Sequence, residues 1–404
     1  MLPTMDYDLI ISGAGPAGLC LAHALSGHGL RIALVEQQPL TALEDPAFDG
    51  REIALTQHSA QLLRTMGLWD RIAPQALSPL RDARVMNGSS TFAMVIDHAL
   101  GGRSELGWLV SNHLIRRAAF EAAQASIQAN GDITLLAGES VSQAHTDNAG
   151  AHVTLSGGKT LTARLLIAAD SRFSSTRRAM GIAADLHDFG RSMLLCCMTH
   201  DEPHHHAAWE WFDYGQTLAL LPMNDDPATG EHRSSVVLTL PSHQIEPLLK
   251  LDATAFASQM TGRFSRRLGT MTLASTRHAY PLVAVYPRHL VAQRFACVGD
   301  AAVGMHPVTA HGFNFGLLGV DNLAGLLRAA HARGEDIAST ALLERFEREH
   351  RRATRPLYLA TQLITRLYTS DAPPARALRN LALRAGERFT PFKRLVAASL
   401  TGGH

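Results

Sequence analysis

Gly13-Ala14-Gly15-Pro16-Ala17-Gly18 is the stretch that decides the fold of this 404-residue chain. It follows an apolar run at residues 6–12, which predicts a buried strand, and it opens a predicted helix. Gly13 permits the tight turn, Gly15 lets the backbone approach a pyrophosphate, and Gly18 allows the helix to pack closely on the strand. A helix N-terminus also offers unpaired N–H groups to an anion. The stretch therefore predicts a dinucleotide site.

A carboxylate completes this first site. Residues 31–36 predict a second strand, and Glu36 ends it, eighteen residues after Gly18. A carboxylate there accepts hydrogen bonds from the adenosine ribose hydroxyls and repels a 2′-phosphate, which disfavours NADP. The βαβ unit begins a parallel sheet with right-handed crossovers. This site alone suits FAD and NAD equally well.

A second glycine-anchored stretch, Gly299-Asp300-Ala301-Ala302, decides between these cofactors. It leads to Pro307 and to Gly312-Phe313-Asn314-Phe315-Gly316, where a further helix is predicted to begin. We expect Asp300 to hold ribityl hydroxyls, which FAD has and NAD lacks. The helix N-terminus would direct N–H donors to the flavin N1–C2=O edge, where the reduced flavin carries negative charge. Together the two sites predict one FAD held at both ends.

Composition excludes several other classes of protein. A net charge of +1 without a basic stripe gives no reason to expect nucleic acid. No window is apolar enough for a membrane span, and the N-terminus shows no signal-peptide pattern. We therefore expect a cytoplasmic protein, with any membrane contact peripheral. The cysteines lack CxxC spacing, which indicates free thiols; they are Cys20, Cys196, Cys197 and Cys297.

The chain is predicted to be an α/β protein with three parts. The first is a discontinuous, Rossmann-like FAD-binding domain made of residues 1–80, 100–185 and 276–370. The second is a mixed-sheet substrate domain made of residues 81–99 and 186–275. The third is an amphipathic helical tail, 371–404, whose basic residues are Arg376, Arg379, Arg384, Arg388, Lys393 and Arg394. The tail could lie on a membrane, dock to another protein of the same biosynthetic route, or form a solvated helix pair.

Several stretches carry a resemblance to a known family: Gly13–Gly18, Asp49–Leu55, Ala168–Ser174 with Arg177, Gly299–Gly316 and Phe389–Leu395. On these stretches the chain resembles the single-component flavin aromatic hydroxylases built like p-hydroxybenzoate hydroxylase. Among these it is similar to the ubiquinone-biosynthesis hydroxylases of the UbiH, UbiF and COQ6 type, most of all to the UbiM branch. The resemblance covers nearly the whole chain.

The resemblance implies roles for individual residues. Arg51 would lie beside the flavin, and Asn112 would contact the cofactor from the start of its helix. Asp170 would belong to the motif that links the cofactor pyrophosphate to the nicotinamide donor. The residues that match the loop over the isoalloxazine are Pro307, Gly312 and Asn314.

The chain departs from the family pattern at three positions. Ser171 replaces the glycine usual after Asp170, and Ala310 replaces a glycine of the flavin loop. Gly304 stands where a histidine is common, although His306 is close by. These departures put the nicotinamide geometry in doubt and leave the FAD prediction standing.

Other side chains leave alternatives open. His200 and His204–His206, near Cys196 and Cys197, lack zinc-ligand spacing, so we expect a solvated turn and no metal. Trp209 and Trp211 point the same way on a predicted strand and either line a substrate cavity or pack in the sheet. No catalytic residue is certain. The candidates in the flavin loop are Pro307, and His306 and His311 as proton shuttles or structural groups.

The function indicated is hydroxylation of an electron-rich aromatic ring. NAD(P)H would reduce FAD, and O₂ would give a C4a-hydroperoxide that the ring attacks. The resemblance implies a prenylated phenol of ubiquinone biosynthesis as substrate. Another aromatic substrate, a flavin dehydrogenase, a halogenase or a flavin-bearing assembly subunit are the alternatives. Halogenases carry Trp-x-Trp-x-Ile-Pro, whereas Trp209-Glu-Trp211 continues here as Phe-Asp-Tyr. Because no second glycine fingerprint exists, the donor is expected to bind transiently.

Overall fold

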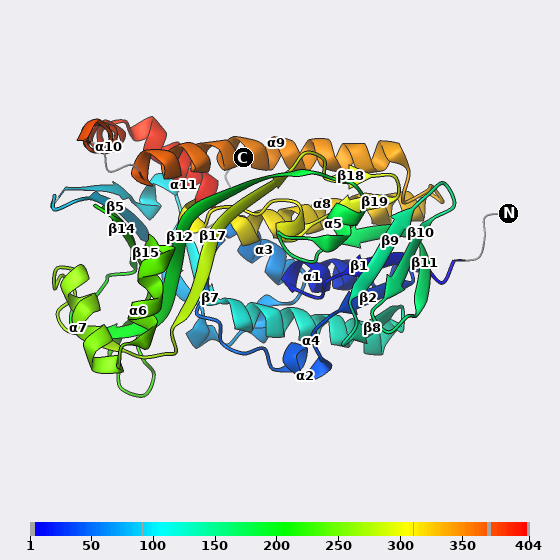
Figure 1. The fold of residues 1–404 in the computed structure, drawn as a ribbon, viewed down its shortest axis with the longest axis horizontal. Coiled ribbons are helices and arrows are strands. Elements are labelled where there is room, and N and C mark those ends of the chain that lie inside the picture. Colours follow the sequence, from blue (N-terminus) through cyan, green and yellow to red (C-terminus); the bar gives the residue numbers. More distant parts are fainter. Residues whose placement is uncertain (1–4, 91, 310, 370–372, 402–404) are drawn as a thin grey trace.

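A parallel sheet forms one end of the computed structural model, which describes residues 5–90, 92–309, 311–369 and 373–401 (Figure 1). Its path is β18–β19–β11–β1–β2–β8, with β10 and β9 continuing from β11. The strands are β1 (Tyr7–Ser12), β2 (Ile32–Glu36), β8 (Ile133–Ala137), β9 (Val141–Thr146), β10 (Ala151–Leu155), β11 (Thr160–Ala168), β18 (Val291–Ala292) and β19 (Phe295–Cys297). The pairs β1–β2, β1–β11, β2–β8 and β11–β19 are parallel, which confirms the predicted parallel sheet of the Rossmann-like domain.

Helices cover this sheet because each has an apolar stripe to bury. Leu9, Ile11 and Leu34 share one hydrophobic core with residues of α1, α4 and α8. The helices that join or cover the first sheet are α1 (Pro16–Leu25), α2 (Leu40–Glu44), α3 (Gln57–Thr65), α4 (Asn112–Asn130), α5 (Ser175–Ala179) and α8 (Gly312–Ala332). Figure 1 shows α8 and α1 lying along the strands toward the middle of the molecule.

A second sheet forms the other end of the molecule, in the order β16–β12–β15–β14–β13–β5–β6, with β17 paired to β12. Its strands are β5 (Asp82–Asn87), β6 (Ala93–Ile96), β12 (Ala184–His200), β13 (Ala207–Asp213), β14 (Gln216–Pro222), β15 (His232–Pro241), β16 (Met271–Leu273) and β17 (His278–Pro287). The early strands β5 and β6 thus join a sheet whose other strands lie far along the chain.

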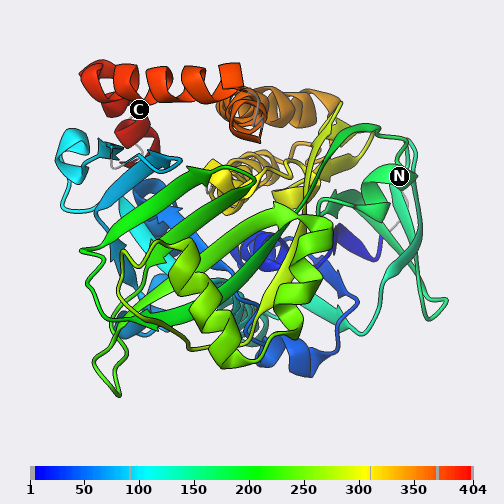
Figure 2. The ribbon, with the colours of Figure 1, turned by 60° about the vertical axis from the view of Figure 1, so that its left-hand side comes forward.

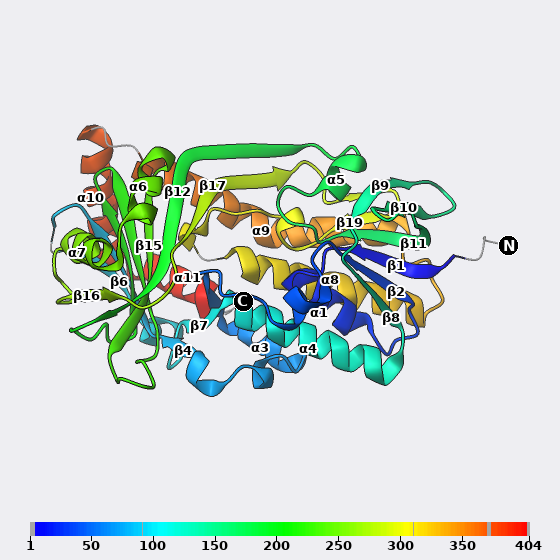
Figure 3. The ribbon, with the colours of Figure 1, turned by 60° about the horizontal axis from the view of Figure 1, so that its bottom comes forward.

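Two long strands connect the ends of the molecule. β12 and β17 pair in antiparallel fashion from Ala184 with Pro287 to Leu195 with His278, and Figure 3 shows them side by side along one flank. The sequence analysis assigned residues 276–370 to the cofactor domain, yet β17 hydrogen-bonds to the second sheet. The physical reason is that β17 passes from one sheet to the other.

The two faces of the second sheet differ because side chains alternate along a strand. One face packs against α6 (Ile245–Lys250) and α7 (Ala253–Arg263) and carries Trp209 and Trp211 in a hydrophobic core. Sheet packing is therefore the role of these tryptophans. The opposite face turns to a cavity.

A small antiparallel sheet supports the region between the ends. It consists of β3 (Glu52–Thr56), β7 (Gly107–Ser111) and β4 (Ser78–Leu80). Glu52 pairs with Ser111 at one end of the β3–β7 ladder. Residues 49–52 and the start of α4 are therefore held beside each other.

The C-terminal helices begin with α9 (Thr340–Thr369), which packs on α8 and beside β18. The next two, α10 (Pro373–Arg388) and α11 (Thr390–Thr401), lie beside β6 at one edge of the second sheet (Figure 2). Leu383 and Ala397 pack against Met94 and Ile96, so the helix pair is docked rather than solvated all round. The Glu387 carboxylate also accepts the Val95 N–H at 2.9 Å. The side chain of Arg376 lies outside the described residues. Among the helices of the described part of the chain, none combines the length and hydropathy that a membrane crossing needs.

Candidate functional site

The glycine turn has the geometry that its sequence predicts. Gly13 has φ +103°, and a Cβ there would lie 2.6 Å from the Ala169 carbonyl oxygen. A Cβ on Gly18 would lie 1.9 Å from the Gly13 carbonyl oxygen. A Cβ on Gly15 would meet no atom within 4 Å. The turn is therefore closely packed on the protein side and open on the other.

Glu36 is fixed by backbone groups. One carboxylate oxygen accepts the Ala14 N–H at 2.7 Å, and the other accepts the Gln38 N–H at 2.9 Å. These bonds hold the carboxylate next to the glycine turn. Lone pairs on both oxygens remain for the ribose hydroxyls of an adenosine.

Asp49 organises the residues expected beside the flavin. Its Oδ2 accepts hydrogen bonds from Arg51 Nε at 2.9 Å and from Asn112 Nδ2 at 2.8 Å. Its backbone carbonyl accepts the Tyr280 hydroxyl at 2.9 Å. Burial raises the pKa of Asp49, but the bonds from Arg51 and Asn112 outweigh it and leave that pKa below its ordinary value. In the sequence Asp49 stands out only as part of the Asp49–Leu55 stretch, and no local pattern indicates this role.

Asp300 forms an ion pair with Arg172, a partner that the sequence did not indicate. Its Oδ2 accepts a hydrogen bond from Arg172 Nη2 at 3.0 Å, and Arg172 Nη1 donates to the Val283 carbonyl oxygen at 3.0 Å. Arg177 Nη1 donates to the carbonyls of Arg172 and Ala301 at 3.1 Å each. Two distant stretches of sequence are thereby joined at the mouth of β19.

Asp170 and Asn314 take positions that the sequence analysis did not foresee. Asp170 Oδ2 accepts the N–H of Thr176 at 3.1 Å and so caps the start of α5. The Asn314 side chain accepts the Thr56 N–H at 3.0 Å and donates to the Ala54 carbonyl at 2.9 Å, which ties α8 to β3. Both side chains bind the protein's own backbone.

The flavin loop brings one of its two histidines to the cavity. His306 Nδ1 accepts the Val308 N–H at 3.2 Å, and its ring lies 4.7 Å from that of Phe189. Burial lowers the pKa of His306 to about 4, so the ring is neutral near pH 7. His311 is buried beside Phe315 and does not line the cavity.

Two of the departures from the family pattern have structural explanations. Ser171 has φ +82°, the left-handed region where glycine is favoured. A Cβ on Gly304 would lie 2.9 Å from the Arg172 Cβ, so a larger residue would displace Arg172. Ala310 lies outside the described residues.

One cavity of about 580 Å³ joins these groups to the second sheet. The residues from the sequence analysis that line it are Gly15, Ala17, Glu36, Arg51, Asn112, Asp300, His306, Pro307 and Gly312. The other predicted site residues do not line the cavity and lie behind the residues that do: Gly13, Gly18, Asp170, His311 and Asn314. At the sheet end the lining is mostly apolar and includes Met193, Leu195, Phe212, Ala219, Leu221 and Val237.

Two partly buried glutamates line this cavity and had no signal in the sequence. Glu52 accepts a hydrogen bond from the Ser111 hydroxyl, and burial raises its pKa to about 7. Glu210 lies on β13 between the two packed tryptophans, and burial raises its pKa to about 8. Period-two alternation could have indicated that Glu210 faces opposite to Trp209 and Trp211, although not that a cavity lies there.

The rings of His200, His204 and His206 lie next to one another, with centroids 5.8 and 5.6 Å apart, and His200 and His204 are buried, so the expected solvated turn is wrong for these two side chains. His200 Nε2 lies 2.8 Å from the Ser234 hydroxyl, and His204 Nε2 lies 2.9 Å from the Met223 carbonyl oxygen. Cys196 and Cys197 are consecutive on β12, so their side chains point to opposite faces.

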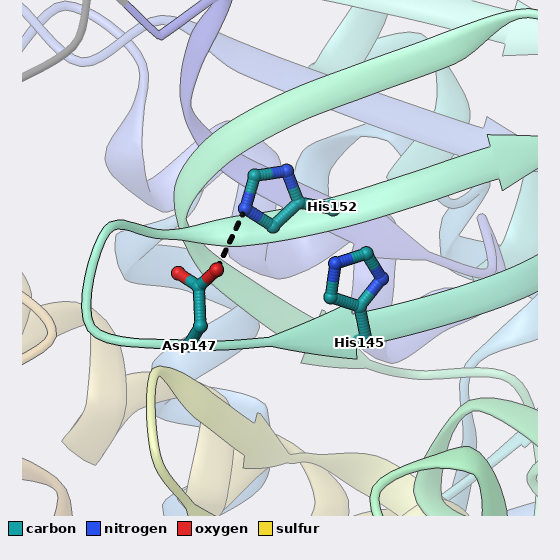
Figure 4. Close-up of side chains that lie close together, drawn as sticks. All are labelled: His145, Asp147 and His152. Carbon is teal, nitrogen blue, oxygen red and sulfur yellow. Dashed lines mark ion pairs between the residues drawn. The ribbon is translucent and has the colours of Figure 1, made fainter.

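His145, Asp147 and His152 form a separate cluster on the β9–β10 hairpin (Figure 4). The two rings stack with centroids 4.7 Å apart and planes 10° apart, and His152 Nε2 lies 3.5 Å from Asp147 Oδ2. This cluster has no part in the cavity.

The residues present fit FAD. The open side of Gly15 and the N-terminus of α1 leave room and N–H donors for a pyrophosphate. Glu36 lies at one end of the same cavity, and Asp300 and Gly312 lie further along it. A Cβ on Gly312 would meet no atom within 4 Å, which leaves space beside the start of α8.

The fold and cavity define a dinucleotide-dependent α/β enzyme whose second sheet lines the cavity mostly with apolar side chains. The FAD binding domain family matches residues 6–358. The chain is 44% identical over 403 residues to the ubiquinone hydroxylase UbiM of Neisseria meningitidis, covering 99% of this chain and 85% of the relative. It is 34% identical over 388 residues to the ubiquinone hydroxylase UbiL of Rhodospirillum rubrum, covering 96% and 88%.

The fold has a close counterpart among solved structures. The p-nitrophenol 4-monooxygenase PnpA of Pseudomonas putida DLL-E4 superimposes with a TM-score of 0.76 at 18% identity, over 98% of this chain and 99% of that one. The chain belongs to the FAD binding domain family, in the group that includes the ubiquinone hydroxylases. Its cofactor is FAD, and the predicted fold class and family are confirmed.

Proposed function

We propose that this protein hydroxylates the aromatic ring of a prenylated phenol or quinol in ubiquinone biosynthesis. The observation that carries the proposal is the single cavity that runs from the glycine turn to an apolar sheet face. When bound, FAD takes electrons from a nicotinamide donor and activates O₂, so that one oxygen atom enters the ring and the other leaves as water. Ubiquinone hydroxylases among its relatives support this substrate class.

The cofactor-binding residues belong to this proposal. Glu36 holds the adenosine ribose, while the first turn, with Gly15 and Ala17, holds the pyrophosphate. Asp300 holds the ribityl chain after exchanging its bond to Arg172. The residues placed around the ring system are Arg51, Asn112, Pro307 and Gly312. Gly13, Gly18, Asp170 and Asn314 act by holding these backbones in place.

The domains divide this work in the proposal. Residues 1–80, 100–185 and 276–370 bind FAD, and residues 81–99 and 186–275 supply the wall that receives the ring. NADH or NADPH binds transiently, since the sequence has no second glycine fingerprint. Apolar side chains at the sheet end exclude water from the reacting atoms, which favours transfer of oxygen to the ring over its loss.

An oxygen-labelling experiment tests the proposed function. Purified protein with its FAD is incubated with 2-geranylphenol, a nicotinamide donor and ¹⁸O₂, and the masses of the products are measured by mass spectrometry. One labelled oxygen atom per product is expected, and a reaction without the donor serves as control. Nicotinamide oxidation without labelled product would contradict the hydroxylase and favour a dehydrogenase.

We infer a peripheral contact with the inner face of the cytoplasmic membrane through the C-terminal helices. Leu359, Leu363, Leu381 and Phe389 are large apolar side chains between 53% and 70% exposed. Arg384, Arg388 and Arg394 are exposed near them in sequence, and cations attract anionic lipid. An apolar substrate would be drawn from the same membrane.

Vesicle flotation tests the membrane contact. The protein should float with vesicles containing phosphatidylglycerol and stay behind with pure phosphatidylcholine. Leu381→Ser with Phe389→Ser should abolish flotation, whereas Tyr214→Ser, at another exposed aromatic, should not. If the double variant floats like the unaltered protein, the C-terminal helices are not the contact.

A further inference from the structure

Glu210 faces the cavity from the middle of an apolar wall. Its neighbours across the sheet are Val85 on β5 and Ala219 on β14, and the same row continues to Val237 and Leu195. Residues paired across strands point to the same face, so Glu210 lies in a row of apolar side chains. Its carboxyl group is the polar exception in that row.

Glu210 has no protein partner in the described part of the chain. Neither a hydrogen bond nor an ion pair reaches its carboxyl group there, and burial is the one cause of its raised pKa. A partly buried carboxyl without a partner destabilises the fold, since it loses part of its water without a compensating bond. Such a group is expected where a ligand provides the missing bond.

The other charged groups of the cavity are already engaged. Arg191, on the same sheet face, donates to the Gly215 carbonyl at 3.1 Å. Across the cavity, Glu52 binds Ser111, Arg51 binds Asp49, and Arg172 binds Asp300. Arg116 donates to Gln38 at 3.0 Å, and Glu36 accepts from two backbone N–H groups. His306 is neutral, and the titratable groups further along the β17 ladder are His278 and Tyr280.

Resting on the proposed function, we propose that Glu210 binds the phenolic hydroxyl of the substrate. It thereby selects neutral phenols over O-alkylated rings and over rings that carry a carboxylate. The geometry supports this role because a flat ring laid on Phe212, Ala219 and Val237 would present its hydroxyl to the single carboxyl of the wall.

The chemistry of the pair is a hydrogen bond with a shared proton. Above about pH 8, where Glu210 is ionised, the phenol O–H donates to the Glu210 carboxylate, and transfer of that proton breaks the O–H bond, forms the carboxyl O–H and leaves its electron pair on the phenolate. A carboxyl whose pKa is about 8 accepts this proton more readily than an ordinary one, since a phenol has a pKa of about 10. Above about pH 8 a ring carboxylate would instead face the ionised Glu210 as a like charge.

Equilibrium binding to the holoenzyme at about pH 9, where Glu210 is ionised, tests this role without requiring turnover. The probes are 2-geranylphenol, its methyl ether and 3-geranyl-4-hydroxybenzoate, and the readout is the change in flavin absorbance on binding. The proteins are the unaltered chain, Glu210→Gln, Glu210→Leu and the surface control Glu246→Gln. Retained FAD content and thermal unfolding identify variants that fold.

The unaltered protein should bind the phenol at least about 10-fold more tightly than the ether, the effect of one buried hydrogen bond to a charged group. Glu210→Leu should bind both equally, and Glu210→Gln should bind the carboxylated ring more tightly than the unaltered protein does. Glu246→Gln should behave like the unaltered protein.

A folded, FAD-bound Glu210→Leu protein that keeps the full preference for the phenol would overturn the role of Glu210. The oxygen-labelling result would then still stand on its own. If the unaltered protein neither binds nor hydroxylates any of the probes, the proposed function and the role of Glu210 fall together.

Discussion

The two ends of the cavity differ in whether their carboxyl groups have hydrogen-bond partners within the protein. At the cofactor end, Glu36, Asp49 and Asp300 each have hydrogen-bond partners within the protein. At the sheet end, Glu210 stands among apolar side chains with no partner in the described residues. The comparison indicates that the protein orders its cofactor site by itself and leaves its substrate site incomplete until a ligand arrives.

The largest expected effect lies at the glycine turn. Gly18→Ala places a Cβ 1.9 Å from the Gly13 carbonyl oxygen, so α1 must move away from β1. We expect purified Gly18→Ala to lack FAD, measured as absorbance near about 450 nm, where flavins absorb. Gly325→Ala on α8 is the control, since its Cβ would meet no atom within 4 Å. A Gly18→Ala protein that retained FAD would show that α1 can move away from the Gly13 turn without loss of the cofactor site.

A smaller effect is expected at Asp49. Asp49→Ala removes the acceptor that holds both Arg51 and Asn112, and a bond to a charged group is worth about 1.5–3 kcal/mol. FAD should bind about 10-fold or more weakly, measured by flavin fluorescence during titration of the apoprotein. Asp97→Ala, at an exposed turn, should leave FAD affinity unchanged. If Asp49→Ala and the unaltered protein bound FAD equally well, Arg51 and Asn112 would not need the hydrogen bonds to Asp49.

Because the Glu210 carboxyl has no partner in the described residues, it should make the stability of the protein depend on pH. The folded-state pKa of Glu210 is about 8 against an ordinary 4.5, so the folded protein holds an extra proton between these values. The contribution of Glu210 to the free energy of unfolding is fully present below its ordinary pKa of 4.5 and is lost as the pH rises through its folded-state pKa of about 8. Glu210→Gln should therefore melt several degrees above the unaltered protein at about pH 8.5 and show little difference at about pH 5. An unchanged difference at the two pH values would contradict the burial of Glu210.

The smallest expected effect concerns Ser171, where the chain departs from its family. Its φ of +82° disfavours a side chain, and more so a β-branched one. Ser171→Gly should change the free energy of unfolding by less than about 1 kcal/mol, and Ser171→Val should lower it by about 2 kcal/mol. Denaturant unfolding measures both. A stable Ser171→Val protein would show that the backbone relaxes at this turn.

The sequence alone predicted the cofactor end well and the sheet end poorly. Gly13–Gly18 and Glu36 act through local geometry, so their spacing was sufficient. The Asp49 contacts and the Arg172–Asp300 pair join residues that are far apart in the chain, and no local pattern indicates such partners. For the same reason the sequence did not indicate that Asp170 and Asn314 bind the backbone at Thr176, Thr56 and Ala54.

What the sequence determined by itself was a parallel sheet, an FAD turn and a family, because these depend on residues adjacent along the chain. Only the tertiary structure decided which face of β13 meets the cavity. Alternation fixes that Glu210 and the two tryptophans point apart, but the packing of α7 on one face determines which side is open. A carboxyl became a candidate substrate ligand because a helix covered the other side of its strand.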